Sequence, residues 1–206
     1  MKATATPTRM VLLRTKRRAA LATRGHKLLK DKLDGLIGKF IEIARDTEAK
    51  MGDLSRKIPE AFKMLVTAGS QMSPEEFEEA VNVPRQTASI EIKRKNLMGV
   101  RIPIYELELE GTPICYSLIN TPAELDRALL NFNSLLPEII LLAGNIKALE
   151  LIAQEITKVK RRVNALEYVL IPELTSAISF IKMKLAEMER SYLTSLMKIK
   201  DIVRAR

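Results

Sequence analysis

The chain has 206 residues, of which 47% are hydrophobic but only 4% are aromatic, and it contains no tryptophan. So low an aromatic content is unusual for a large globular core and typical of coiled coils. The formal net charge is +9, and Cys115 is the only cysteine, which excludes an internal disulfide and favours a reducing compartment.

The N-terminal third predicts one long helix. An apolar or small residue recurs every three or four positions, the spacing of a helix that keeps one seam toward a partner helix. The seam reads Ala44, Thr47, Met51, Leu54, Ile58, Phe62 and Leu65, and upstream, less regularly, Met10, Leu13, Ala20, Leu28 and Leu36.

Residues 69–124 predict a small inserted connector. Ser73, Pro74 and Glu76 form a capping signal for a short helix that ends near Val81. Period-two alternation over 89–93 and over 105–109, with a Gly-containing turn at 96–101, predicts a β-hairpin. A further short strand is expected at 114–118.

The last third predicts a second long helix, which begins near 121–124 (TPAE) with another capping signal. About 70 residues would form a helix of roughly 105 Å, longer than any compact core needs. Its expected seam comprises Leu135, Ile139, Leu142, Ile146, Leu149, Ala153, Ile156, Val163, Leu166, Leu170, Leu174, Ile178, Ile181, Leu185, Met188, Tyr192, Ser195, Ile199 and Ile202.

Two long helices at the two ends of the chain are expected to pair with each other. The connector carries its own folding signals and need not run back along the helices, so antiparallel pairing is favoured; the alternative is a bundle with other chains. The predicted fold is mainly α: a long antiparallel two-helix left-handed coiled coil, residues 9–68 with 125–203, and an inserted subdomain, residues 69–124, with a small helix plus a β-hairpin.

Two apolar sites are candidates for contact with a partner protein. The segment 135–152 is apolar on more than one face, so either a partner or the connector covers it. At the hairpin tip, ordinary packing and exposure to a partner are equally compatible with the sequence. The candidate partner contacts are Leu97, Met98, Leu136, Ile140, Leu141 and Leu151.

Positive charge gathers at the two ends of the chain. Up to Lys32 there are ten basic residues against one acid, Asp31. Antiparallel pairing brings these cations beside those of the C-terminal end, which favours an acidic partner surface over a merely solvated face. The candidate contacts are Arg9, Arg14, Arg17, Arg18, Arg24, Lys27, Lys184, Arg190 and Lys198.

Signals for catalysis or cofactor binding are missing from the sequence. One histidine, His26, and one cysteine do not make a metal cluster or a nucleophile–base pair. The segment 35–40 (GLIGKF) lacks the spacing and the hydroxyl residue of a phosphate loop. Few aromatic residues and no nucleic-acid-binding motif disfavour nucleic acid as a partner. We therefore expect a non-enzymatic chain with no cofactor and no metal.

No membrane-spanning or secretory segment is expected. The most apolar stretch, 135–143, is short and interrupted by Pro137 and Glu138, and no charged-then-apolar segment opens the chain. The expected location is therefore cytoplasmic.

Several motifs resemble the D subunit of the V-type and A-type rotary ATPases, in the prokaryotic form with a short C-terminus. They are 7–9 (PTR), 23–32 (TRGHKLLKDK), 95–100 (KNLMGV), 123–127 (AELDR) and 161–168 (RRVNALEY), followed by Ile171 and Pro172. The resemblance extends over nearly the whole chain in order.

The resemblance implies a central-stalk rotor axle that passes torque between a catalytic hexamer and the ion-translocating membrane ring. Its implied partners are the catalytic and regulatory ATPase subunits, the small F subunit of the central stalk and a funnel-shaped protein on the ring, with the complex peripheral to the cell membrane. Two alternatives stay open: a basic coiled-coil adaptor and a nucleic-acid-binding coiled coil.

Pro172 is expected to kink the C-terminal helix, because proline lacks an N–H and its ring crowds the carbonyl of Tyr168. An asymmetric shaft would help to impose different conformations on equivalent catalytic sites. A bend that only serves packing explains the proline equally well.

Overall fold

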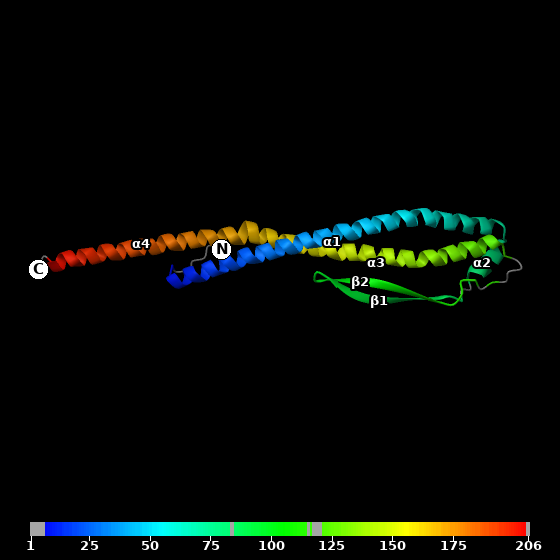
Figure 1. Cartoon of the computed structure of the whole chain (residues 1–206), viewed down its shortest axis with the longest axis horizontal. Coiled ribbons are helices and arrows are strands. Elements are labelled where there is room, and N and C mark those ends of the chain that lie inside the picture. The colour runs from blue at the N-terminus through cyan, green and yellow to red at the C-terminus, as the bar shows by residue number, and fades with distance from the viewer. Residues whose placement is uncertain (1–6, 83–84, 115, 117–120, 205–206) are drawn as a thin grey trace. The chain divides into compact units, whose positions relative to one another are not determined.

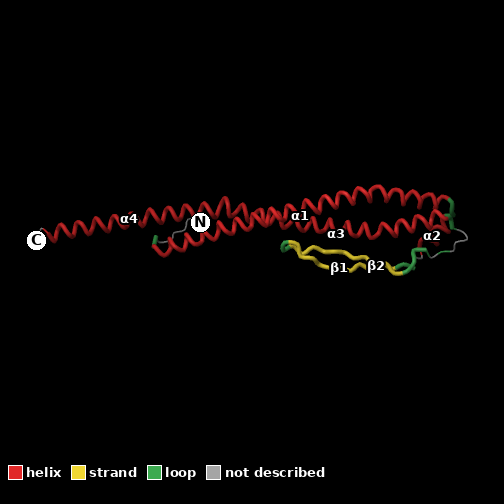
Figure 2. The backbone as a smooth tube through the Cα atoms, viewed as in Figure 1, coloured by secondary structure: helices red, strands yellow, loops and turns green. Residues whose placement is uncertain are grey.

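The structure is a computed structural model that describes residues 7–82, 85–114, 116 and 121–204. Its elements in chain order are α1 (Arg9–Ser70), α2 (Pro74–Asn82), β1 (Thr87–Leu97), β2 (Val100–Glu110), α3 (Ala123–Ala165), a π-helical turn (Leu166–Leu170) and α4 (Ile171–Arg204) (Figure 1). The described residues form a mainly α fold, in which a small helix and a hairpin come between α1 and α3 in chain order (Figure 2). The predicted fold class is confirmed.

The chain divides into two compact units, Met1–Gly35 with Thr157–Arg206, and Leu36–Ile156. We call these the terminal unit and the connector unit. The predicted boundaries at 69 and 124 differ from this division and stay a prediction.

In the connector unit, α1 and α3 pair in antiparallel fashion. The Phe62 ring contacts the Phe132 ring edge-to-face at 5.1 Å between centroids, and the Lys57 ammonium lies 2.8 Å from the Glu138 carboxylate. Further along, the amide of Asn145 approaches the carboxylate of α1 residue Asp46. Residue numbers fall along α1 as they rise along α3, so the two helices run in opposite directions.

The core of this pairing is a cluster of Leu54, Ala61 and Leu135, each less than 5% exposed. Ile58, Phe132 and Leu142 pack against the cluster. Such burial of the apolar stripes, rather than helix propensity, stabilises helices of this length.

The buried stripe of α3 departs from the predicted seam between residues 139 and 153. Ala148 and Ile152 are buried, whereas Ile139 and Ile146 are exposed. The segment is apolar on several faces, so periodicity alone could not choose between adjacent rows. The prediction of Ile139 and Ile146 as seam residues is wrong.

Proline occurs inside both paired helices, Pro59 in α1 and Pro137 in α3, without ending either one. Each proline lacks the N–H that would bond the carbonyl four residues earlier. Both side chains lie on the exposed side, where water can solvate that carbonyl.

The short helix α2 begins with the predicted capping box. The Glu76 N–H donates to the Ser73 hydroxyl at 3.3 Å, and the Ser73 N–H donates to the Glu76 carboxylate at 3.2 Å. The Phe77 ring lies against Gly69, where a Cβ would meet it at 3.5 Å, so α2 packs back on the end of α1.

The predicted hairpin is confirmed and is longer than expected, with pairs running from Thr87↔Glu110 to Leu97↔Val100. Met98 and Gly99 form its turn, both with positive φ, as a tight two-residue hairpin turn requires. The Gly99 N–H donates to the Asn96 side-chain oxygen at 2.9 Å. Of the further strand predicted at 114–118, Ile114 and Tyr116 lie outside any strand, and 115, 117 and 118 lie outside the described residues.

The hairpin packs along α3. The Tyr105 ring lies directly over Gly144, so closely that a Cβ at Gly144 would come within 3.1 Å of it. Near the base of the hairpin, the Gln86 amide donates to the side-chain oxygen of Asn133 at 2.8 Å. Glycine at 144 is therefore what allows the tyrosine to approach the helix.

Candidate interaction surfaces

The terminal unit carries the nine predicted basic contact residues, and all of them are exposed. Arg9, Arg14, Arg17, Arg18, Arg24 and Lys27 lie on α1, and Lys184, Arg190 and Lys198 lie on α4.

The first turns of α1 lie against the middle of α4. The Arg9 guanidinium forms an ion pair with the Glu189 carboxylate at 2.8 Å, and a shallow depression between the helices is lined by Leu12, Leu13, Leu185 and their neighbours. The pair is exposed on both sides, so it contributes at most about 1 kcal/mol to stability. It places Arg9, at the start of α1, beside the part of α4 that carries Lys184 and Arg190.

Beyond this contact, α4 is exposed on every side: each described residue from 186 to 204 is exposed. Eight large apolar side chains are among them. They are Met188, Tyr192, Leu193, Leu196, Met197, Ile199, Ile202 and Val203. A helix that is apolar on several sides and exposed is a candidate surface for a partner.

Much of the seam predicted for the terminal unit is wrong. Met10, Leu13 and Leu28 on α1 are exposed, as are Met188 and Tyr192 on α4. In the terminal unit, the buried or half-buried positions of α1 instead include Leu12, Thr15, Ala19, Ala22, His26, Leu29 and Leu33. Small side chains fill part of this interface and larger apolar ones face outward, which reverses the usual expectation.

A π-turn interrupts the helix between α3 and α4. The Ile171 N–H donates to the carbonyl of Leu166, five residues earlier, instead of four. Pro172, one residue later, has no N–H to give the Tyr168 carbonyl, which makes a regular helix less favourable here. The kink expected at Pro172 stays a prediction; the structure records a π-turn at this place, and the helix continues through the proline.

His26, the only histidine, lies opposite this turn. Its Nε2 is 3.4 Å from a carboxylate oxygen of Glu167, and its side chain is largely buried between α1 and the π-turn. The histidine thus serves to pack the two helices together in the terminal unit.

In the connector unit, the predicted partner contacts are only partly covered. Leu136 and Leu141 are exposed, whereas Ile140 and Leu151 are half-buried. The Tyr105 contact with Gly144 means that the hairpin covers part of α3, yet an apolar surface remains beside it.

The two residues at the hairpin tip differ in exposure, so neither ordinary packing nor exposure to a partner describes both of them. Met98 is 44% exposed at the turn, and Leu97 is half-buried. Both therefore stay predicted contacts, and Met98 is the more accessible of the two.

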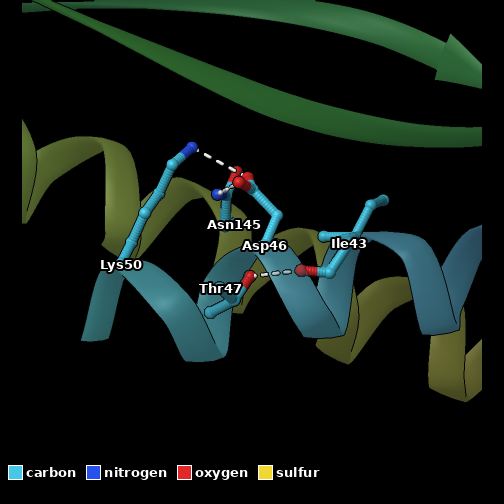
Figure 3. A network of polar contacts seen from close by, with 5 residues as sticks. All are labelled: Ile43, Asp46, Thr47, Lys50 and Asn145. Atoms are coloured by element: carbon cyan, nitrogen blue, oxygen red, sulfur yellow. Dashed lines mark hydrogen bonds and ion pairs between the residues drawn. The ribbon is translucent and has the colours of Figure 1, made fainter. Parts of the chain in front are cut away.

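An exposed polar contact joins α1 and α3 in the connector unit. The ammonium of Lys50 and the amide of Asn145 converge on the Asp46 carboxylate, at 2.8 and 3.5 Å (Figure 3). The buried Thr47 hydroxyl donates to the Ile43 carbonyl at 2.7 Å. Sequence reasoning placed Thr47 in the seam but gave no role to Asp46 or Asn145; an Asp four residues before a Lys was the available signal.

Two lysines in the connector unit, Lys93 and Lys147, have a raised pKa. The pKa of Lys93 is raised above 10.5, chiefly by its hydrogen bond to Glu106 on the neighbouring strand. A hydrogen bond to Glu150 raises the pKa of Lys147 in the same way. Both groups are exposed, and the shifts mark surface ion pairs rather than a reactive site.

Within the described ranges, no group of three or more His, Cys, Asp or Glu side chains is arranged to hold a metal ion. In the same part of the chain, no helix is long and apolar enough to cross a membrane.

Comparison with known proteins assigns a family. The family model for the D subunit of ATP synthase matches residues 11–201. The chain is 43% identical to the V-type ATP synthase D subunit of Clostridium botulinum (strain ATCC 19397 / Type A), over 98% of this chain and 96% of that protein. It is 45% identical to the protein of the same name from Thermoanaerobacter sp. (strain X514), over 96% and 95%. The chain therefore belongs to the family of ATP synthase D subunits.

Proposed function

We propose that this chain is the non-catalytic central rotor shaft of a V-type ATP synthase. It passes torque between the catalytic hexamer and the ion-translocating membrane ring. The observation that carries the proposal is full-length family membership together with antiparallel helices whose cationic ends share one unit. A paired helix resists twisting better than a single helix, because the side chains of the seam hold the two strands in register.

The terminal unit enters the hexamer. Its exposed cations, Arg9 to Lys27 on α1 and Lys184 to Lys198 on α4, face the lining of the hexamer, and the exposed apolar residues of α4 slide against that lining. Exposed charges act mainly by steering association, and their attraction is screened by salt. Such an interface guides the shaft without fixing it at one angle.

The connector unit is the end that carries the other stalk proteins, the small F subunit and the funnel-shaped protein on the membrane ring. The exposed Leu136 and Leu141 on α3 and Met98 at the hairpin tip supply the apolar contact. The complex is peripheral to the cell membrane on its cytoplasmic side.

Affinity purification of tagged chain from membranes of the source cell tests this function. Recovery of the catalytic and regulatory subunits, with ATP hydrolysis in the eluate, is expected. Nucleic acid or unrelated proteins without ATPase subunits would contradict the proposal and favour the adaptor or nucleic-acid-binding alternatives.

Paired surface variants then test which unit meets which partner. Leu141→Asp places a charge on the exposed apolar surface of α3 and is expected to release the small stalk protein while the hexamer stays bound. Arg17→Glu with Arg18→Glu in the terminal unit is expected to weaken the hexamer contact and leave the small stalk protein bound. The opposite pattern of loss would refute the assignment of the two units.

A further inference from the structure

The π-turn changes the spacing of the buried stripe. Val159 and Val163 are buried, Leu166 and Ile171 are half-buried, and Ile181 further on is buried again. The step from Leu166 to Ile171 is five residues, where a coiled-coil seam advances by three or four. The π-turn thus adds one residue to the longest step between inward positions of a regular seam.

The extra residue widens the outward side of the helix. A regular seam leaves two or three residues between successive inward positions, whereas here four consecutive residues, 167–170, are all exposed. Three of them are large and apolar: Tyr168 is 71% exposed, Val169 is 54% and Leu170 is 39%. An apolar surface made by a costly backbone distortion is a candidate functional surface.

Cations lie about two helical turns before this apolar group. Arg161 and Arg162 are exposed and precede Val169 and Leu170 by eight residues, which is about one α-turn and one wider π-turn. They therefore lie along the same side of the helix as those side chains. Glu167, the one acid within the turn, has its carboxylate 3.4 Å from His26 of α1.

We propose that Arg161, Arg162, Tyr168, Val169 and Leu170, the π-turn surface, form a docking site for an acidic and apolar surface of the hexamer lining. The inference rests on the proposed function, since it requires the chain to sit within a hexamer. Because Arg161 and Arg162 are positively charged, the complementary partner surface carries carboxylates. Because Tyr168, Val169 and Leu170 are apolar, that surface also carries apolar side chains beside its carboxylates. The site lies apart in sequence from the basic residues at the two chain ends.

Site-specific photo-crosslinking in the assembled complex tests the site. Tyr168→p-benzoylphenylalanine is compared with Val66→p-benzoylphenylalanine, which replaces an equally exposed apolar residue in the connector unit. We expect the probe at 168 to crosslink to catalytic or regulatory subunits and the probe at 66 not to. Crosslinks from 168 to another stalk protein, or to none while the hexamer co-purifies, would overturn the site and leave the shaft proposal standing. A wild-type chain that does not co-purify with the hexamer would overturn both.

Charge variants give an independent readout. Arg161→Glu with Arg162→Glu is expected to weaken hexamer binding about tenfold at low salt, and Arg161→Lys with Arg162→Lys to retain most of it, because opposing like charges at an interface are costly. Helix content by circular dichroism should match wild type in both, since the side chains are exposed. Equal affinity of the two variants would overturn the role of these cations.

Discussion

Leu135→Ala tests the pairing of α1 with α3 most sharply among single substitutions. Leu135 is 4% exposed and packs in one cluster with Leu54 and Ala61. The change removes about three methylene equivalents, and at about 0.8 kcal/mol each this costs about 2.4 kcal/mol in transfer free energy. A residual cavity adds to that cost, so a destabilisation of about 2.5–4 kcal/mol is expected.

The matched control is Leu141→Ala, the same chemical change six residues further along the same helix. Leu141 is 46% exposed in this chain, so its truncation should cost less than about 1 kcal/mol. Both free energies of unfolding come from urea titration followed by circular dichroism, with the slope of the transition checked for constancy. A cost at Leu135 no greater than at Leu141 would refute the assignment of Leu135 to the helix interface.

Three further experiments probe polar groups of the connector unit. A double-mutant cycle on Lys57 and Glu138 should give a coupling of about 0.2–1 kcal/mol that shrinks with added salt, since both side chains are about half exposed; a larger, salt-independent value would contradict a surface pair. Asn145→Leu should raise the urea midpoint, because a half-buried apolar side chain stabilises a helix pair more than the exposed 3.5 Å contact of Asn145 with Asp46, and a fall in midpoint would contradict this. The raised pKa of Lys93 means that its contribution to stability is present below pH 10.5 and lost as pH rises through the folded-state pKa. Glu106→Gln should therefore lower the Lys93 pKa measured by NMR and flatten the alkaline loss of stability, and an unchanged titration would refute the contact.

Most of the elements were predictable because they rest on local chemistry. The capping box of Ser73 and Glu76 sets the start of α2, and alternation marks the two strands of the hairpin. These signals act within a few residues, so the sequence alone contains them.

The inward face of the terminal unit was not predictable in the same way. Apolar rows at Met10 and Leu13 and at Leu12 and Ala19 satisfy nearly the same helical period, and only the partner helix selects between them. The sequence around Pro172 likewise indicated an irregular helix but not its form. A five-residue step between inward positions indicates a π-turn rather than a kink. Here the step runs from Leu166 to Ile171, and it can be read from the sequence only when both residues are known to face inward.

Among the candidate contacts, the exposure of the cations was predictable, whereas that of the apolar residues was not. All nine predicted cations are exposed, because charged side chains near chain ends rarely become buried without a partner. Which apolar residues accompany them depends on helix pairing, and the structure exposes Leu13 and Tyr192, which periodicity alone had placed in the seam.

The most direct test of the shaft function is single-molecule rotation in the assembled complex. The hexamer is fixed to a surface, and a probe is attached to the chain through Arg56→Cys, an exposed position in the connector unit, in a Cys115→Ser background. The account predicts unidirectional rotation of the probe that starts with ATP and stops when ATP is removed. ATP hydrolysis by the same complexes with the probe stationary would contradict it.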